Sequence, residues 1–442
     1  MQLSLITRLE LFLFKILAFC LPFSVEIDIA GESRIHFPTE ILIGLLAVLL
    51  AIDLLKNYSV LKSEYPGELL WIVPLVAAYI LFILFSEMPE VSAKFSLVNI
   101  IYILIFYVLQ VRLFKLDQGL FPQLLLIYSL GLIAVTGWAI FRYHTFEWNP
   151  VVVPGIFRPF YRDHTILGAS AALLAVFWLC FSFMTKMAVS RFVSVALAIF
   201  FLLLVIFSGS RAAFFSLFIS LSVGVLFLLR FRTRHVLLLL FSLLLTAFFF
   251  GGTIREKLLD NLAESRNPNA GYVEHFRSAG NISTDASNLE RMNRWVAAWR
   301  MFTARPLTGF GPGTYQFTYI PFQEESLKTH LSVEDPLDIP ENSGGTAHSE
   351  YLLVLSEMGI LGFVALILFF GRLMYVVFDK SYGHNQKIKI MVAFSALAGY
   401  WFHALFNNFL NTEKFAFLFW GMAAWLIANY YDTDEKGILP GG

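Results

Sequence analysis

The residues best suited to catalysis are one histidine and several arginines that stand near the ends of apolar segments. His348 lies in "GGTAHSEYLL", residues 344–353, where a polar loop runs directly into a long apolar stretch. A histidine with an ordinary pKa of about 6.5 can take a proton from an attacking hydroxyl at neutral pH. A lone histidine is usually structural, but this one ends the one long polar segment of the sequence. We therefore interpret His348 as a candidate catalytic residue.

The arginines are candidates for binding an anion. Arg211 follows a two-serine turn in "FSGSRAAF" and opens a new apolar segment. A guanidinium fork matches phosphate oxygens and stays charged, and the first N–H groups of a helix also attract anions. The alternative is that arginines near segment ends lie at the membrane interface with snorkelling side chains. The other arginines that we expect on the same side are Arg158, Arg162, Arg291, Arg294 and Arg305.

A second group of polar residues lies in "RPFYRDHTILGA", residues 158–169, just before an apolar segment. Capping of the following helix by Asp163 or Thr165 explains one of these residues but not the whole set. We therefore expect at least one of Arg158, Arg162 and His164 to bind the substrate.

Carboxylates near His348 form a third group. Glu350 and Glu357 are seven residues apart and share one face of a predicted helix. Glu350 either orients His348 and contributes to substrate binding, or it stays solvated. Four further polar residues either line the same cavity or form hydrogen bonds between helices, namely His403, Asn407, Asn408 and Asn411.

Metal and cofactor sites are not predicted. The nine histidines show neither HxxxH nor HExxH spacing, so no histidine metal site is indicated. "TGFGPGTY", residues 308–315, resembles a phosphate loop superficially but lacks its lysine and flanking strand, which favours tight turns. The two cysteines indicate no disulfide framework.

The composition identifies the setting of these residues. Of 442 residues, 58% are hydrophobic and only 14% charged, and the mean hydropathy is +0.69. Soluble domains carry about 25% charged residues, whereas a bilayer core needs about 20 apolar residues per helix. We therefore predict an all-α, polytopic membrane protein of about twelve transmembrane helices with one large periplasmic loop that contains helices. The predicted spans are residues 9–23, 39–56, 68–86, 94–111, 119–142, 164–184, 192–208, 211–230, 235–251, 349–378, 387–411 and 413–431.

Three regions follow from this pattern. Residues 1–251 hold transmembrane helices 1–9, residues 252–348 form the periplasmic loop, and residues 349–442 hold helices 10–12 and a cytoplasmic tail. Lys and Arg, among them Arg112, gather in the short loops of one side, which predicts that these loops and both termini are cytoplasmic. In the loop, apolar residues of "NLERMNRWVAAWRMFTARP" recur at helical spacing, with Arg291 and Arg294 on the polar side. The net charge of zero gives no indication of nucleic acid as a partner. The apolar spans instead predict contact with membrane lipids.

Three segments resemble the hallmark motifs of the O-antigen ligase family, whose core is shared with the O-antigen polymerases. They are "FSGSRAAF", "RMNRWVAAWRMFTARPLTGFGPGTYQF" and "AHSEYLLVLSEMGILGF". The family pattern has Ser-Arg at a span start, Arg-x3-Trp and Pro-Leu-x-Gly-x-Gly in the outer loop, then His-x2-Tyr-Leu and Glu-x-Gly. The segments occur in the family order between about residues 200 and 365.

The resemblance implies a fold of the membrane glycosyltransferase C type in the bacterial inner membrane, with the active site facing the periplasm. The donor would be a glycan on undecaprenyl pyrophosphate. The acceptor would be a hydroxyl of lipid A–core for a ligase, or another donor-linked glycan for a polymerase. Ligases of this kind are inverting and metal-independent, so the resemblance implies no cofactor.

The resemblance also assigns roles to individual residues. Arg211 matches the Ser-Arg arginine, Arg291 matches the arginine four before the tryptophan, and His348 matches the essential loop histidine. These three are implied to be catalytic. Arg294 has no firm family counterpart, so we count it as a candidate substrate-binding residue.

Several other functions remain open at this point. The nearest is a polymerase of O-antigen or exopolysaccharide on the same scaffold, and another is glycan transfer to serine or threonine of a protein. A polysaccharide transporter would place charges deep within several spans and often shows an inverted repeat. The sequence shows neither feature, and it concentrates its polar residues on one side.

Overall fold

The computed structural model describes residues 4–30, 33–56, 67–228, 286–329, 332–333, 345–378 and 384–431. The α-helices are α1 Leu5–Cys20, α2 Thr39–Lys56, α4 Val73–Leu81, α5 Pro89–Ile103, α6 Gln110–Leu116, α7 Leu120–Thr145, α8 His164–Met184, α9 Ala188–Phe207, α10 Arg211–Leu228, α13 Ala286–Ala304, α14 Tyr315–Thr318, α15 Glu350–Phe378, α16 His384–His403 and α17 Glu413–Tyr430. The strands are β1 Val25–Ala30 and β2 Ser33–Phe37. Short 3-10 helices are η1 Leu21–Phe23, η2 Gly67–Ile72, η3 Phe82–Phe85, η5 Pro150–Gly155, η8 Ile320–Phe322 and η9 Glu325–Leu327, and η4 Leu104–Leu109 is π-helical.

The chain is a helical membrane protein. Within the described ranges, five helices are long and apolar enough to cross a membrane, namely Pro89–Leu116, Leu120–Thr145, His164–Met184, Ala188–Phe207 and Glu350–Phe378. Each predicted span coincides with helix except 235–251, which lies outside the described residues. The predicted span 387–411 is too long, because α16 ends at His403 and the chain then turns. The count of twelve spans stays a prediction.

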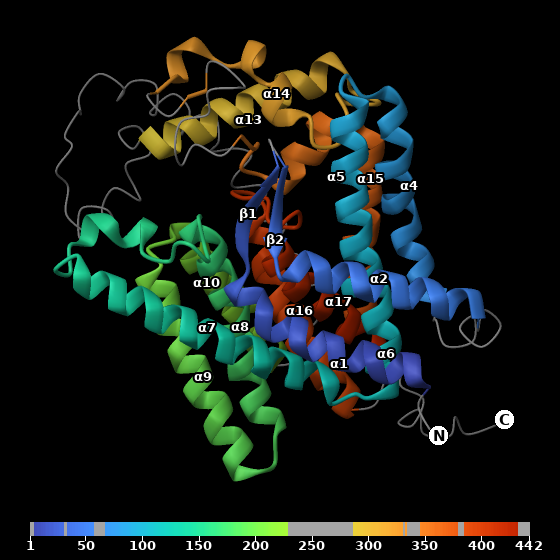
Figure 1. The fold of residues 1–442 in the computed structure, drawn as a ribbon, viewed down its shortest axis with the longest axis vertical. Coiled ribbons are helices and arrows are strands. Elements are labelled where there is room, and N and C mark those ends of the chain that lie inside the picture. Colours follow the sequence, from blue (N-terminus) through green and yellow to red (C-terminus); the bar gives the residue numbers. More distant parts are fainter. Residues whose placement is uncertain are drawn as a thin grey trace.

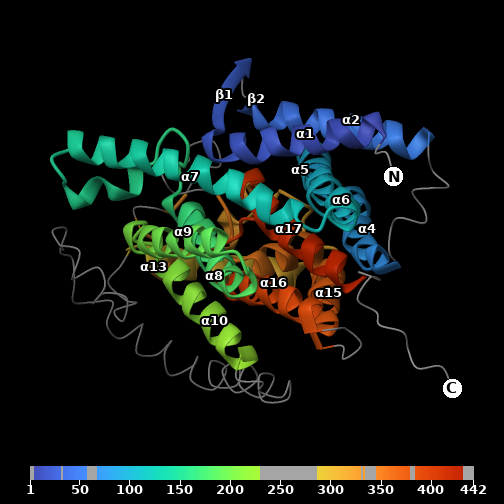
Figure 2. The same cartoon turned by 90° about the horizontal axis from the view of Figure 1, so that it is seen from below.

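The helices pack around a buried apolar core. The polar elements lie at one end of the molecule. Figure 1 shows α13 and α14 across the upper ends of α5 and α15, whereas the turn between α8 and α9 lies at the opposite end. Helices α1, α2 and α7 form a layer on one side, and the strands project from it (Figure 2). Helix α10 packs against α8 and α16. Buried aromatic residues such as Tyr107, Tyr128 and Trp425 fill the interior.

The prediction of an all-α chain misses a β-hairpin. Strands β1 and β2 pair antiparallel, with Glu26 opposite His36. A lone hairpin is only marginally stable in water, and this one is tied to the helices by polar contacts. Ser24 donates to the Glu413 carboxylate over 2.6 Å, and Arg162 forms an ion pair with Glu26 over 2.6 Å.

Helix α15 is interrupted where the glycine-rich segment 308–315 packs against it. This segment forms tight turns, as predicted, and the N–H of Gly311 donates to the carbonyl of Glu357 over 2.8 Å. Gly359 has φ +61° inside α15, and a Cβ atom there would lie 2.5 Å from the backbone of Leu307. Only glycine allows both the positive φ and this close approach. The glycine-rich turns and the Glu-x-Gly motif therefore form one backbone joint.

A buried ion-pair network joins α1, α2 and α6. We expected Arg112 to lie in a short cytoplasmic loop, but it is buried in α6. Its guanidinium lies 2.7 Å from Asp53 and 3.5 Å from Glu10, and it donates to Thr7 over 3.0 Å. A buried charge needs such partners. The prediction for Arg112 was wrong because partners on two other helices allow the charge to be buried.

Candidate functional site

Helix α13 forms where the apolar spacing predicts it, but it buries a different face. Arg294 is fully buried, whereas Trp299 is 52% exposed. The reason is that a later segment covers the Arg294 side of the helix. Tyr315 donates to the carbonyl of Arg294 over 2.8 Å, and the Tyr319 ring lies against the guanidinium. The prediction that Arg294 lies on the polar side of the helix is therefore wrong.

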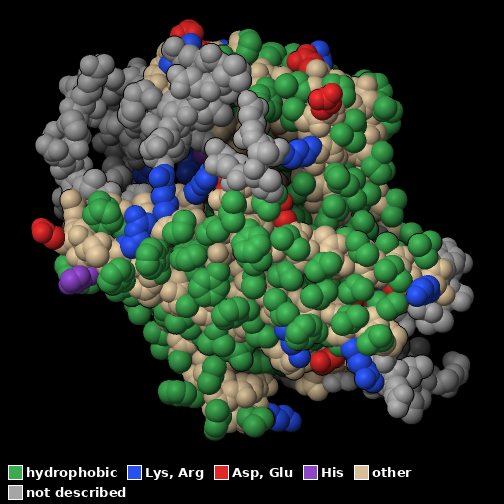
Figure 3. Space-filling view, in the orientation of Figure 1, with side chains coloured by type: hydrophobic (Ala, Val, Ile, Leu, Met, Phe, Trp, Pro, Cys, Tyr) green, Lys and Arg blue, Asp and Glu red, His purple; other side chains and the backbone are tan. Residues whose placement is uncertain are grey.

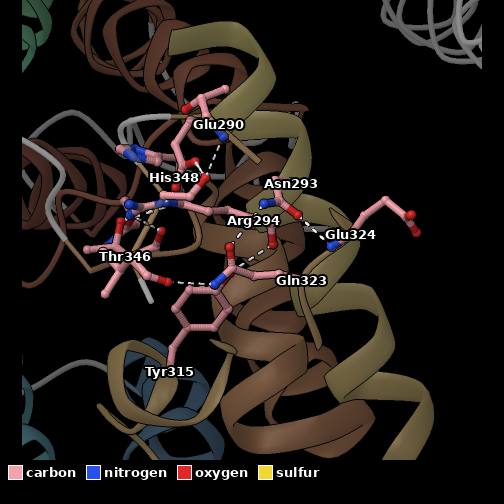
Figure 4. A network of polar contacts seen from close by, with 12 residues as sticks. Glu290, Asn293, Arg294, Tyr315, Gln323, Glu324, Thr346 and His348 are labelled. Atoms are coloured by element: carbon pink, nitrogen blue, oxygen red, sulfur yellow. Dashed lines mark hydrogen bonds and ion pairs between the residues drawn. The ribbon is translucent and has the colours of Figure 1, made fainter. Parts of the chain in front are cut away.

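Arg294 is the centre of a buried polar network (Figure 4). Its Nε donates to the Glu290 carboxylate over 2.7 Å, and its Nη1 donates to the carbonyl of Thr346 over 3.1 Å. The side chain of the preceding residue, Asn293, donates to Gln323 over 3.1 Å. The network thus ties α13 to two segments that follow it in the sequence.

The backbone around His348 is held by three contacts. His348 has φ +48°, a conformation that non-glycine residues rarely adopt. Its N–H donates to Thr346 Oγ1 over 3.3 Å, and its carbonyl accepts from Trp295 Nε1 over 3.2 Å. Two residues on, the N–H of Glu350 donates to the carbonyl of Ala404 over 2.9 Å. Such a conformation persists only where the surroundings hold it, so these contacts determine where the imidazole lies.

The electrostatic environment keeps His348 neutral. Burial lowers the pKa of His348 well below its usual value of 6.5, and the charges of Arg291 and Arg294 lower it further. Both effects disfavour the imidazolium form. At pH 7 the ring is therefore uncharged, and it can accept a hydrogen bond or a proton from a hydroxyl.

Arg291 connects this histidine to α16. Its Nη1 donates to the carbonyl of Phe406 over 3.2 Å, in the turn after α16. The guanidinium also interacts electrostatically with His403, the last residue of that helix. Arg291 is partly buried and lies one helical turn before Trp295, on the same face of α13. The predicted pair Arg291 and His348 is therefore brought together.

Arg211 lies at the start of α10, after the tight turn that the sequence predicts. Gly209 has φ +66° in this turn. Helix α10 packs against α16, whose last residue, His403, interacts electrostatically with Arg291. A continuous set of contacts therefore links α10 with α16 and α13.

Arg158 and Arg162 lie in the segment that leads into α8. Arg158 is partly buried, and its carbonyl accepts from Arg142 Nη1 over 2.6 Å and from Trp138 Nε1 over 3.0 Å. Arg162 is 55% exposed in its side chain and pairs with Glu26 of the hairpin. The structure thus gives Arg162 a role in anchoring the hairpin, whereas substrate binding by either arginine stays a prediction.

His164 begins α8, and the helix cap before it is confirmed. The Asp163 carboxylate accepts the N–H of Thr165 over 2.7 Å. His164 interacts electrostatically with Arg291. The structure therefore places His164 within electrostatic range of Arg291.

The side chain of Glu350 contacts α16 and does not stay solvated. It is buried, and its carboxylate accepts from the Tyr400 hydroxyl over 3.1 Å. Glu357, on the same helix, is also buried and accepts the N–H of Tyr315 over 3.0 Å. The expectation that Glu350 stays solvated is wrong, because Tyr400 of α16 covers it. Its contribution to substrate binding stays a prediction.

The positive charges of Arg291 and Arg294 on α13 act on the neutral imidazole of His348, which lies just before α15. Figure 3 shows Lys and Arg side chains gathered between α13 and the helices α7 and α10. In the part of the chain that the structure describes, no group of three or more His, Cys, Asp or Glu side chains is placed to hold a metal ion. The arginines are suited to an anionic group, and the imidazole is suited to a hydroxyl.

Two residues that support the site were not singled out from the sequence. Trp295 was interpreted only as part of an apolar stripe, yet it holds the carbonyl of His348. Thr346 accepts the N–H of His348 and donates to Asn408 over 2.7 Å. The fixed Arg-x3-Trp spacing was the available signal for Trp295. No local pattern indicates Thr346, because its partners are remote in the sequence.

Comparison with known proteins gives one family match. Residues 195–367 match the family model described as O-antigen ligase. This region includes Arg211, Arg291 and His348. A search of curated proteins gives no match. The family match supports the assignment to the O-antigen ligase superfamily that the sequence motifs predict.

Proposed function

We propose that this chain, a member of the O-antigen ligase superfamily by the match over residues 195–367, transfers a glycan from undecaprenyl pyrophosphate to a hydroxyl of lipid A–core. The family match supports ligase-type or polymerase-type activity at a membrane. In the proposal the donor is held at the periplasmic face of the bacterial inner membrane. The reaction inverts the anomeric carbon and uses no metal.

The proposed mechanism is a single displacement. The acceptor oxygen attacks the anomeric carbon while the bond between that carbon and the pyrophosphate oxygen breaks. His348 accepts the hydroxyl proton or orients the hydroxyl, and the electron pair of the broken bond leaves with undecaprenyl pyrophosphate. Arg211 and Arg291 stabilise the growing negative charge of the leaving group. Arg158 and His164 extend the donor site.

One observation carries this proposal. Arg291 contacts the turn after α16 and lowers the pKa of His348. Arg291 is therefore a cation suited to pyrophosphate that acts on the imidazole of His348, and this imidazole is neutral at pH 7. A glycosyl pyrophosphate is already a good leaving group, so positioning and charge stabilisation suit the reaction better than a strong base would.

Transfer by the purified protein in detergent tests the proposal. The donor is a glycan on undecaprenyl pyrophosphate, EDTA is present throughout, and reactions run with and without lipid A–core. We expect a shifted lipid A–core band that requires both substrates. A ladder from the donor alone would establish a polymerase instead, and no product in either reaction would contradict glycan transfer to these acceptors.

A further inference from the structure

We propose that Arg294 is a positioning residue, which holds the segment of Thr346 to His348 in the backbone conformation that the site requires. This inference deepens the proposed function and rests on it for its kinetic test. Arg294 does not bind substrate in this proposal, because its guanidinium is enclosed by protein. It acts through the carbonyl of Thr346.

The contacts of Arg294 span three parts of the chain. Its Nη1 donates to the Thr346 carbonyl over 3.1 Å, two residues before His348 (Figure 4). Its Nε donates to Glu290 over 2.7 Å, and the second Glu290 oxygen accepts from Ser332 over 2.5 Å. Only a planar fork can serve two acceptors in fixed directions in this way. The guanidinium therefore sets the distance between α13 and the segment that carries His348.

Burial explains why this contact is rigid. Arg294 is fully buried and Glu290 nearly so. A buried ion pair with its hydrogen bonds satisfied has few alternative arrangements, since each alternative leaves a charge unpaired. The Tyr319 ring lies 5.6 Å from the Arg294 guanidinium and closes the remaining side. By contrast, Arg300 on the same helix pairs with Glu324 at the surface.

The backbone of His348 needs such support. Its φ of +48° is unfavourable for a non-glycine residue. Thr346 provides the Oγ1 that accepts the His348 N–H, so a displaced Thr346 would release that bond. Trp295, which follows Arg294, holds the carbonyl of His348. One short stretch of α13 thus fixes both backbone groups of the histidine.

The charged groups around His348 influence its pKa, so a change in that pKa can test the inference. From α13 these are Arg291 and Arg294, and both lower the pKa of His348. The nearby carboxylates are occupied elsewhere, since Glu290 pairs with Arg294 and Glu350 accepts from Tyr400. At the ends of neighbouring helices, His164 of α8 and His403 of α16 interact electrostatically with Arg291, and Arg211 begins α10.

The experiment compares two substitutions at Arg294 with a matched control. Arg294→Lys keeps the charge but loses the fork. The double variant Glu290→Gln with Arg294→Gln loses both charges and leaves no buried charge unpaired. Arg300→Gln is the control, because it removes an arginine from the same helix at an exposed ion pair. Two readouts are taken: kcat and KM for transfer, and the pH dependence of His348 modification by diethyl pyrocarbonate, which reacts with neutral imidazole.

We expect kcat to fall about 10-fold in Arg294→Lys and about 100-fold in the double variant, with the KM for donor changed less than about 3-fold. The midpoint of His348 modification should stay low in Arg294→Lys and rise in the double variant, while burial and the charge of Arg291 still keep it below the ordinary histidine value. Arg300→Gln should match the unsubstituted protein in both readouts.

Unchanged kcat and midpoint in both Arg294 variants would overturn the inference. So would a rise in donor KM that accounts for the whole loss of activity, because Arg294 would then support the donor site. If the unsubstituted protein transfers no glycan, the proposed function fails, while the modification midpoint still decides whether Arg294 controls the surroundings of His348. Size-exclusion profiles in detergent identify any variant that fails to fold, and Arg294→Lys then carries the test.

Discussion

At the scale of single residues, the site combines a neutral imidazole with guanidinium groups that cannot lose their charge. Burial and the neighbouring arginines lower the pKa of His348 well below 6.5. A base with a low pKa is a weak base, so in the proposed mechanism we expect His348 mainly to orient the hydroxyl. Most of the barrier reduction is then expected from the arginines, which act on the charge of the leaving group.

The pH dependence of transfer follows from the direction of this shift. The active form of His348 is neutral, and its pKa is lowered, so it stays neutral as the pH falls through 6.5. We expect kcat to remain constant from pH 7.5 through about 6.5 and to decline only at more acidic values. Rates measured from about pH 5 to 8 check this. A loss of half the activity near pH 6.5 would show that His348 titrates as an unperturbed histidine.

Replacement of the candidate catalytic residues should remove activity without unfolding the protein. We expect His348→Ala to lower kcat by about 100-fold or more, and Arg211→Ala or Arg291→Ala to lower it by about 100- to 1,000-fold. Transfer assays with proteins of matched size-exclusion profiles test this. His144→Ala and Arg191→Ala are controls because both side chains lie outside the site. Full activity in any of the three site variants would remove that residue from the mechanism.

At the scale of elements, the joint between α15 and the glycine-rich turns places the start of α15 relative to α13. Gly309 and Gly359 both have positive φ, and both approach the opposing backbone closely. The N–H of Ile360 donates to the carbonyl of Pro306 over 2.8 Å across the same joint. Since α13 ends just before Pro306, this joint fixes the angle at which α13 crosses α15.

A side chain at Gly359 should therefore destabilise the packing of α15 against the glycine-rich turns. A Cβ atom at Gly359 would lie 2.5 Å from the Leu307 backbone, whereas nothing lies within 4 Å of a Cβ atom at Gly371 of the same helix. We expect Gly359→Ala to cost about 2 kcal/mol or more and to lower the apparent unfolding temperature in detergent. Gly371→Ala should leave that temperature unchanged or raise it slightly. Equal behaviour of the two variants would contradict the role of the joint.

At the scale of the whole molecule, the positive-inside pattern predicts that α13 lies outside the cell membrane and that the turn between α8 and α9 lies inside. The structure places these two parts at opposite ends of the molecule (Figure 1). Helices of sufficient length and apolarity run between them, including α8, α9 and α15. The proposed donor site of Arg211, Arg291 and His348 would then face the periplasm.

Cysteine labelling tests this orientation. In a background with Cys20→Ser and Cys180→Ser, a single cysteine is introduced either at Ser326, in η9 near α13, or at Lys186, in the turn between α8 and α9. Both positions are exposed. A membrane-impermeant maleimide added to intact spheroplasts should label Ser326→Cys and leave Lys186→Cys unlabelled until the membrane is opened. The reverse pattern would show that the site faces the cytoplasm.

What the sequence determined by itself is local. The apolar runs, the helix over 286–304, the Asp163 cap and the turn at 208–211 depend on neighbouring residues, so their spacing was sufficient to predict them. Burial of Arg294, the Tyr400 contact of Glu350 and the positive φ of His348 depend on partners brought from elsewhere in the chain. Only the tertiary structure decided these features, because a side chain's partner and its exposure are set by the segment that covers it.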